Sequence, residues 1–240
     1  MKSEVLRPLV CTSGIIVFPS QEVIIDVGRS KSIKAVEEAQ EHFEGKVILS
    51  AQKDVTVDDP NDQQMFHVGT LCNIVHIRRM DGYIRVKFRG LKRVALHSIL
   101  DENTMLSAHV SIIEDVKQDE KEEIALVRKI AKQLEELDVL GQHLPKEVIN
   151  ELANGVSAGQ LSDQIAQILP ISLDQRQRLL ETAAINDRLL MILEEMESEK
   201  ELSAIEERIN EKVKTRIEDS QKEYYLREKM RAIKEELGDV

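Results

Sequence analysis

Histidine and cysteine are the residues of this sequence whose side chains most readily bind a metal or act as nucleophiles. Cys11 and Cys72 lie far apart and neither belongs to a Cys-x-x-Cys motif, so neither a zinc site nor a disulfide framework is indicated. The histidines lack the His-x(3–5)-His and His-Glu-x-x-His spacings that hold a metal on one helix face. They stand at His42, His67, His76, His97, His109 and His143. We therefore expect no metal-binding residue.

The sequence also lacks the motifs that bind a nucleotide phosphate or activate a nucleophile. Gly45-Lys46 is the only Gly-Lys pair, and Gln40 occupies the position of the first glycine of a phosphate-binding loop. No Gly-x-Ser-x-Gly motif occurs, and the neighbouring acids Asp58 and Asp59 lie in loop-forming sequence. We predict no catalytic and no cofactor-binding residue within these 240 residues.

Basic side chains around one predicted hairpin are the best candidate for contact with a charged partner. Residues alternate along 84–89, so that Arg85, Lys87 and Arg89 share one face of a strand. The wider basic run also contains Arg78, Arg79, Lys92 and Arg93. We interpret this face as the solvated face of a hairpin. Contact with nucleic acid and contact with an acidic protein or neighbouring domain are the less favoured alternatives; Tyr83 is the one stacking group on the face, and the net charge of -11 argues against general nucleic-acid affinity.

The elements that carry these residues form a β-rich segment, which we assign to residues 1–117. Short apolar runs predict strands at 15–18, 22–27 and 46–50. A helix is predicted to begin at Ser30 and to end before Gly45. Alternating runs on both sides of Asp81-Gly82 predict a hairpin with a type I′ turn.

A small helical bundle is predicted for residues 118–183, with the domain boundary placed at the polar stretch 117–123. Its first helix would bury Ile124, Val127, Ile130, Leu134 and Leu137, which recur at helical spacing. Capping boxes are predicted for the two pairs Ser157 with Gln160 and Ser172 with Gln175. A further helix is predicted to begin at Pro145, carrying Val148, Ile149 and Leu152 and ending at Asn154-Gly155.

Residues 184–240 are predicted to form one very long projecting helix, because the stretch from Ala184 to Leu237 contains no glycine or proline. Its apolar residues recur at steps of three and four and make a narrow stripe that needs a partner, which favours weak self-association. Within this stripe, Tyr224, Tyr225, Leu226 and Met230 are the candidate protein-contact residues.

Composition excludes several other classes of protein. Charged residues make up 32% and aromatic residues 3%, a balance that disfavours a deep aromatic-lined ligand pocket. No stretch is long and apolar enough for a membrane span and the N-terminus lacks the apolar region of a signal peptide, so we expect a cytoplasmic protein with no membrane contact.

Five stretches resemble the N-terminal region of Lon, the family of ATP-dependent serine proteases. They are GIIVFPSQEVIIDVGRSKSIKAVEEA at 14–39, AQKDVTVDDP at 51–60, VGT at 68–70, DGYIRVKFRGLKRV at 81–94 and QKEYYLREKMRAIKEELGD at 221–239. One departure is Leu9-Val10-Cys11-Thr12, where Lon proteins usually carry Leu-Pro-Leu-Arg-type residues. The last block is long and specific, and the resemblance spans nearly the whole chain.

The resemblance implies an α+β chain with a PUA-like first domain, a helical second domain and a long helix leading to an AAA+ module and a Ser-Lys protease domain. The motifs of both modules lie outside these residues, so we interpret the chain as a fragment. ATP and magnesium are implied for the full-length parent. The implied role is recognition of unfolded or damaged protein substrates and assembly of a homo-hexamer. The alternative, set apart from the resemblance, is a free-standing adaptor that dimerises through its helix.

Overall fold

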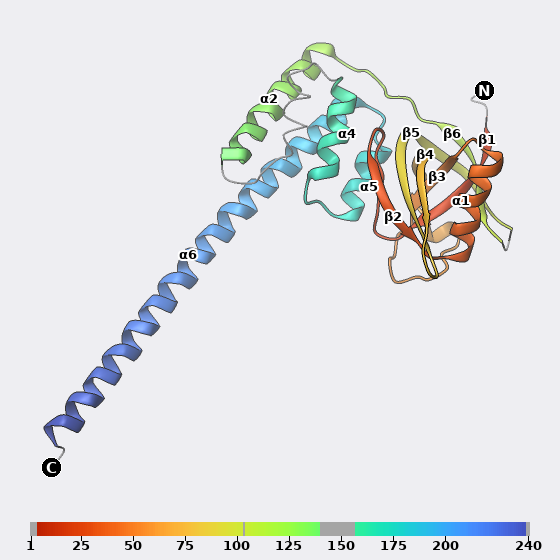
Figure 1. Ribbon diagram of the computed structural model, residues 1–240. Helices are drawn as coiled ribbons and strands as arrows, with labels where there is room; N and C mark the ends of the chain where they lie inside the picture. Colours follow the sequence, from red (N-terminus) through yellow and green to blue (C-terminus); the bar gives the residue numbers. More distant parts are fainter. Residues whose placement is uncertain (1–3, 103, 140–156, 239–240) are drawn as a thin grey trace. The chain divides into compact units, whose positions relative to one another are not determined.

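The computed structural model describes residues 4–102, 104–139 and 157–238 (Figure 1). Two compact units are present, Met1–Glu195 and Met196–Val240, and each is described by itself. The predicted division at residues 117 and 183 stays a prediction. The helix predicted from Pro145 to Asn154 lies outside the described residues.

A mixed sheet of six strands forms the larger part of the first unit. Its order is β2-β5-β4-β3-β1-β6, and β5 also pairs with β6, so that five of the strands form a closed ring. Only β1 and β3 run parallel; the other pairs are antiparallel. The strands are β1 Val5–Thr12, β2 Glu22–Val27, β3 Lys46–Ala51, β4 Val68–Arg79, β5 Ile84–Asp101 and β6 Leu106–Ile112. The predicted strands at 22–27 and 46–50 are therefore confirmed.

Strand β5 connects the sheet because different parts of its 18 residues pair with different neighbours. Its first residues pair with β2, from Ile84 opposite Val27 to Arg89 opposite Glu22. Its later residues, from Val94 onwards, pair with β6. Strand β4 pairs with β5 along most of the length of β4. As a result β2 lies outside the closed ring and pairs with β5 alone.

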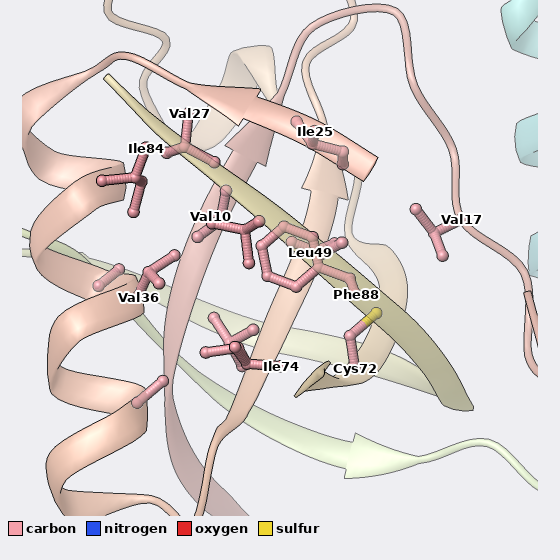
Figure 2. Close-up of a cluster of buried hydrophobic side chains, with 14 residues drawn as sticks. Val10, Val17, Ile25, Val27, Val36, Leu49, Cys72, Ile74, Ile84 and Phe88 are labelled. Carbon is pink, nitrogen blue, oxygen red and sulfur yellow. The ribbon is translucent and has the colours of Figure 1, made fainter. Parts of the chain in front are cut away.

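The main core lies between the inner faces of these strands and helix α1, which covers residues Ser30–His42 (Figure 2). Ile84, Val86 and Phe88 all point into this core, as the period-two pattern predicts. From α1, Val36 and Ala39 are completely buried. Burial of these apolar groups holds helix and sheet together. A second cluster contains Leu9, Ile48, Met65, Leu96 and Val110.

The prediction of a strand at residues 15–18 is wrong. Ile16, Val17 and Phe18 are buried and Ile15 is half-buried, but the segment pairs with no strand, and side-chain hydrogen bonds hold it instead. The Thr70 hydroxyl donates to the Val17 carbonyl, and the Phe18 amide donates to Gln21 Oε1 at 2.9 Å. Gly90 allows the 15–18 segment to lie close against β5, because a Cβ at this position would lie 2.1 Å from the Phe18 carbonyl oxygen. A short apolar run therefore marks a buried loop here.

The predicted hairpin is present between β4 and β5, but its turn is not type I′. A type I′ turn needs positive φ at both central residues, and of the two only Gly82, with φ 81°, has it. The Met80 amide donates to the Tyr83 carbonyl at 3.0 Å. Asp81 therefore keeps an ordinary backbone conformation.

Among the described residues, the first unit also contains helices α2 (Glu120–Val139), α4 (Ala158–Ile168) and α5 (Leu173–Glu181) and the start of α6 (Ile185–Leu237). Helix α2 begins four residues before the predicted Ile124, because the Asp119 carboxylate accepts hydrogen bonds from the amides of Lys121 and Glu122. Ile124 is exposed, and Leu126 is buried instead. The predicted burial of Ile130 and Leu134 is confirmed.

The two predicted capping boxes differ in outcome. The hydroxyl of Ser172 accepts from the amide of Gln175, whose side chain accepts in turn from the Ser172 amide, so this box is complete. Ser157 also accepts from the amide of Gln160. Its hydroxyl, however, donates to Gln160 Oε1 at 3.0 Å, so the glutamine does not reach the backbone. Both predicted serines are still the N-cap residues of their helices.

Helix α6 runs from Ile185 to Leu237, a length of 53 residues. Its first apolar residues are buried in the first unit: Ile185, Leu189, Ile192 and Leu193. In the second unit the apolar residues from Leu202 onwards are exposed. One uninterrupted helix thus has a buried apolar face at its start and an uncovered one further along.

Candidate functional site

Arg85, Lys87 and Arg89 lie on the outer face of β5, as predicted, but acids on β2 lie opposite them. Arg85 donates to both Asp26 oxygens, from Nε at 2.7 Å and from Nη2 at 2.8 Å. Lys87 Nζ lies 2.6 Å from Glu22 Oε2, and Arg89 Nε donates to Glu22 Oε1 at 2.8 Å. We name these five residues the charged ladder.

The two acids of the charged ladder offset most of the charge of its three basic residues. Hydrogen bonds from Lys87 and Arg89 lower the pKa of the Glu22 carboxyl, and those from Arg85 lower the pKa of the Asp26 carboxyl. Both acids are therefore ionised at neutral pH. An incoming polyanion would have to displace these existing partners, which makes the face a poor nucleic-acid site. Its role as a contact for a charged partner stays a prediction.

Other members of the basic run also have acidic partners. Arg79 Nη2 lies 3.0 Å from Glu37 Oε1, and Lys92 Nζ lies 2.9 Å from Glu114 Oε1. Arg93, which the sequence placed with the exposed basic residues, is only 3% exposed. The interpretation of Arg93 as a surface residue is wrong.

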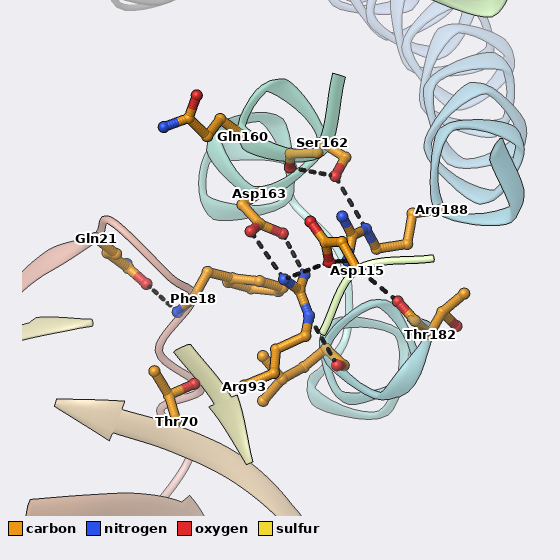
Figure 3. A network of polar contacts seen from close by, with 12 residues as sticks. Phe18, Gln21, Thr70, Arg93, Asp115, Gln160, Ser162, Asp163, Thr182 and Arg188 are labelled. Carbon is orange, nitrogen blue, oxygen red and sulfur yellow. Dashed lines mark hydrogen bonds and ion pairs between the residues drawn. The ribbon is translucent and has the colours of Figure 1, made fainter. Parts of the chain in front are cut away.

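Arg93 belongs to a buried ion network that the sequence did not reveal (Figure 3). Its guanidinium donates twice to the Asp163 carboxylate of α4, once from Nη1 at 2.9 Å. The Nε of the same side chain donates to the Leu180 carbonyl of α5 at 3.0 Å. Strand β5 is thereby bound to two helices.

A second arginine, Arg188 of α6, completes the network and is 1% exposed. Its Nη1 donates to Asp115 Oδ1 at 2.7 Å and to the Thr182 carbonyl at 3.2 Å. Its Nε donates to the Ser162 hydroxyl at 3.1 Å. Asp115 also lies 3.7 Å from Arg93 Nη1, so it links the two arginines. Two arginines and two aspartates make the network neutral, and it joins β5, α4 and α6 within the first unit.

The two carboxyl groups of the network have pKa values that shift in opposite directions. Burial raises the pKa of Asp163, and the opposing effect of Arg93 does not cancel it. For Asp115 burial also acts to raise the pKa, but the hydrogen bond and charge of Arg188, with the charge of Arg93, leave it lowered.

The predicted contact residues of α6 are all exposed and lie in the second unit. The exposed fractions are 68% for Tyr224, 63% for Tyr225, 51% for Leu226 and 61% for Met230. Exposure at this level is unusual for four neighbouring apolar or aromatic residues on one helix. What these residues contact stays a prediction.

Cys11 and Cys72 are both buried, and neither forms a disulfide. Burial raises the pKa of each thiol. Across residues 4–102, 104–139 and 157–238, no group of three or more histidine, cysteine, aspartate or glutamate side chains could hold a metal ion. Among the same residues, no helix is long and apolar enough to cross a membrane.

Solved structures share this arrangement of strands and helices. The N terminal domain of the Mycobacterium avium complex Lon protease superposes with a TM-score of 0.67, at 19% identity, covering 80% of this chain and 98% of that one. The Lon N-terminal domain protein from Xanthomonas campestris gives a TM-score of 0.55 at 17% identity over 79% of this chain and 97% of that one. The fold is therefore that of an N-terminal domain of the α+β class, as predicted.

Sequence similarity identifies the family. Residues 7–198 match the family described as the ATP-dependent protease La (LON) substrate-binding domain. The Lon proteases of Escherichia coli K12 and of Buchnera aphidicola subsp. Baizongia pistaciae are each 36% identical over 97% of this chain, and Lon protease 1 of Bacillus subtilis is 34% identical. The chain belongs to the Lon protease family and contains its substrate-binding domain. It spans about 30% of the length of these relatives.

Proposed function

We propose that this chain recognises protein substrates for an ATP-dependent serine protease that degrades misfolded, damaged and short-lived regulatory proteins. The observation that carries the proposal is the match of residues 7–198 to the family of Lon substrate-binding domains. The chain supplies recognition, and the catalytic groups belong to other parts of the parent protein. ATP and magnesium act in those other parts, and the parent works in the cytoplasm.

Exposed apolar side chains on the sheet support this role. Ile24 is 62% exposed and Val75 43% exposed, and both stand on strands whose opposite face is buried. They lie singly among polar neighbours, so each contact with a substrate is shallow and weak. Useful affinity then requires several copies that engage one unfolded chain, because linked sites raise the effective concentration of one another.

Assembly into a hexamer is the second part of the proposal. The exposed apolar residues of α6 from Leu202 to Leu237 favour it, since a helix with such a stripe is stabilised by a partner. The same observation favours the alternative function, an adaptor that dimerises through α6. The two functions can be distinguished with an unfolded protein. Substrate recognition requires the chain to bind it, and the adaptor function does not.

Binding of an unfolded protein tests the proposal. Fluorescently labelled α-lactalbumin, reduced and carboxymethylated so that it stays unfolded, is titrated with the chain alone and with the chain fused to a hexameric scaffold. We expect weak binding by the chain, at least tenfold tighter binding by the fusion, and none to native α-lactalbumin. Absence of binding by both forms would refute substrate recognition and leave the adaptor function.

A further inference from the structure

The edge of the sheet formed by β2 presents main-chain groups that point away from β5. The Gly90 amide donates to the Gln21 carbonyl at 2.8 Å, which makes that pair a hydrogen-bonded one. Hydrogen-bonded and non-bonded pairs alternate along an antiparallel ladder. The N–H and C=O groups of Val23, Ile25 and Val27 therefore face β5, and those of Glu22, Ile24 and Asp26 face outward.

These outward groups have no hydrogen-bond partner among the described residues. Strand β2 pairs with β5 alone, and no other backbone or side-chain group donates to or accepts from the main chain of Glu22, Ile24 or Asp26. The Ile24 side chain between the two acids is 62% exposed. An edge of this kind is a template for pairing with another extended chain.

A cavity of about 180 Å³ lies between β2 and the C-terminal residues of β1. Its apolar wall includes Val10, Ile15, Ile25 and Val27, of which the last two are on the inner face of β2. Arg29 also lines it, and its buried Nη1 has no acceptor among the described residues. Cavities of about 150 Å³ hold a benzene-sized group, so this one has room for an aliphatic side chain.

We propose that an extended segment of an unfolded polypeptide pairs with the free edge of β2 and places one aliphatic side chain in this cavity. The inference rests on the proposed function and specifies its substrate class. Main-chain hydrogen bonds supply affinity that is independent of sequence, and the cavity selects for an aliphatic residue. Most backbone groups of a folded protein are already paired, so an unfolded segment is the favoured occupant.

The cavity distinguishes this occupant from a second copy of the chain. If two β2 strands paired edge to edge, the residues of the second copy that face inward would be Val23, Ile25 and Val27. Ile25 and Val27 are buried in their own core and would not reach the cavity of the neighbour. A polypeptide without a fold of its own has side chains free to enter it.

Substitution of Ile24 separates the main-chain contribution from that of the side chain. I24P removes an outward N–H and blocks pairing, yet it keeps the bonds to β5, since proline is tolerated on an edge strand whose N–H faces solvent. I24T is the matched control, because it loses the apolar side chain but keeps the N–H. With the hexameric fusion and unfolded α-lactalbumin, we expect roughly tenfold weaker binding for I24P and less than threefold for I24T.

Amide hydrogen exchange followed by NMR tests the same inference on the unmodified chain, so the result does not depend on whether I24P folds. Addition of unfolded α-lactalbumin should slow exchange at Glu22, Ile24 and Asp26. Exchange at Val23, Ile25 and Val27, which already pair with β5, should stay unchanged. Equal binding of I24P and wild type, or unchanged exchange at the three outward amides, would overturn edge pairing.

Two further outcomes are distinguishable. If the wild-type fusion does not bind unfolded α-lactalbumin, the proposed function fails before edge pairing is tested. If the outward amides slow with increasing protein concentration and no α-lactalbumin, a second copy occupies the edge, and the inference about unfolded polypeptide is wrong.

Discussion

Arg93 of β5 and Asp163 of α4 form a buried ion pair across 70 positions of the chain. The arginine is 3% exposed and the aspartate side chain 6%. Two hydrogen bonds join them, so charge and geometry are both matched. This pair binds the closed ring of strands to the helices that follow it.

Removal of one partner of this pair should be strongly destabilising. R93M leaves the Asp163 carboxylate buried without its main partner, which costs about 3–5 kcal/mol of unfolding free energy. The double variant R93M/D163L should recover much of that loss, because no unpaired charge remains. Urea denaturation measures both. R89M, on the exposed part of the same strand, is the control and should have a much smaller effect; an equally small effect of R93M would contradict the prediction.

Asp115 and Asp163 should contribute to pH-dependent stability with opposite signs. The lowered pKa of Asp115 stabilises the folded state above its unfolded pKa of about 3.9, and this stabilisation is lost as pH falls through the folded value. The raised pKa of Asp163 has the reverse effect, so its contribution becomes less favourable as pH rises from about 4.

Asparagine variants measured between pH 3 and pH 7 test this. The stability of wild type relative to D115N should increase with pH, and that relative to D163N should decrease. If the stability difference changed with pH in the same direction for both variants, the pKa values of Asp115 and Asp163 would not be shifted in opposite directions.

Gly90 should not tolerate a side chain. A Cβ there would lie 2.1 Å from the Phe18 carbonyl oxygen, so G90A must displace the backbone of the buried 15–18 segment, at a cost of about 1–3 kcal/mol. Gly28 is the control, because a Cβ there would meet its nearest atom, on Tyr83, at 4.0 Å. Thermal unfolding should show a lower Tm for G90A and little change for G28A. An unchanged Tm for G90A would mean that this segment relaxes freely.

Self-association should depend on the second unit. In sedimentation velocity we expect concentration-dependent oligomers for the whole chain and a monomer for a version that ends after Lys200. A version that ends at Ala183 is unsuitable, because it lacks Arg188 and the buried start of α6. In the whole chain I209E should weaken association and the neighbouring N210E should not. Monomers at every concentration for all forms would refute it.

Local patterns in the sequence predict local structure here. The period-two alternation of residues 84–89 gives the inner and outer faces of β5, and the serine at position 172 gives the start of α5. These features depend on residues within a few positions of one another. The exposed apolar stripe of α6 likewise follows from residues three and four positions apart.

Features that depend on distant partners could not be predicted in this way. Arg93 has the same spacing as the exposed Arg85 and Arg89, and only its position against α4 and α5 makes it buried. The apolar run at 15–18 is typical of a buried strand, but hydrogen bonds to the distant Thr70 and to Gln21 hold it as a loop. The acids of the charged ladder precede their basic partners by about sixty positions.

The pairing of β1 with β6 delays the completion of this sheet during synthesis. Val5 lies opposite Val110 in the ring, so β1 cannot take its final place until nearly the whole segment has left the ribosome. Contacts between such distant residues are slow to form, because the intervening loop must close first. Until then the apolar residues of β1 are uncovered, and we expect this interval to be the period of greatest risk of aggregation during synthesis.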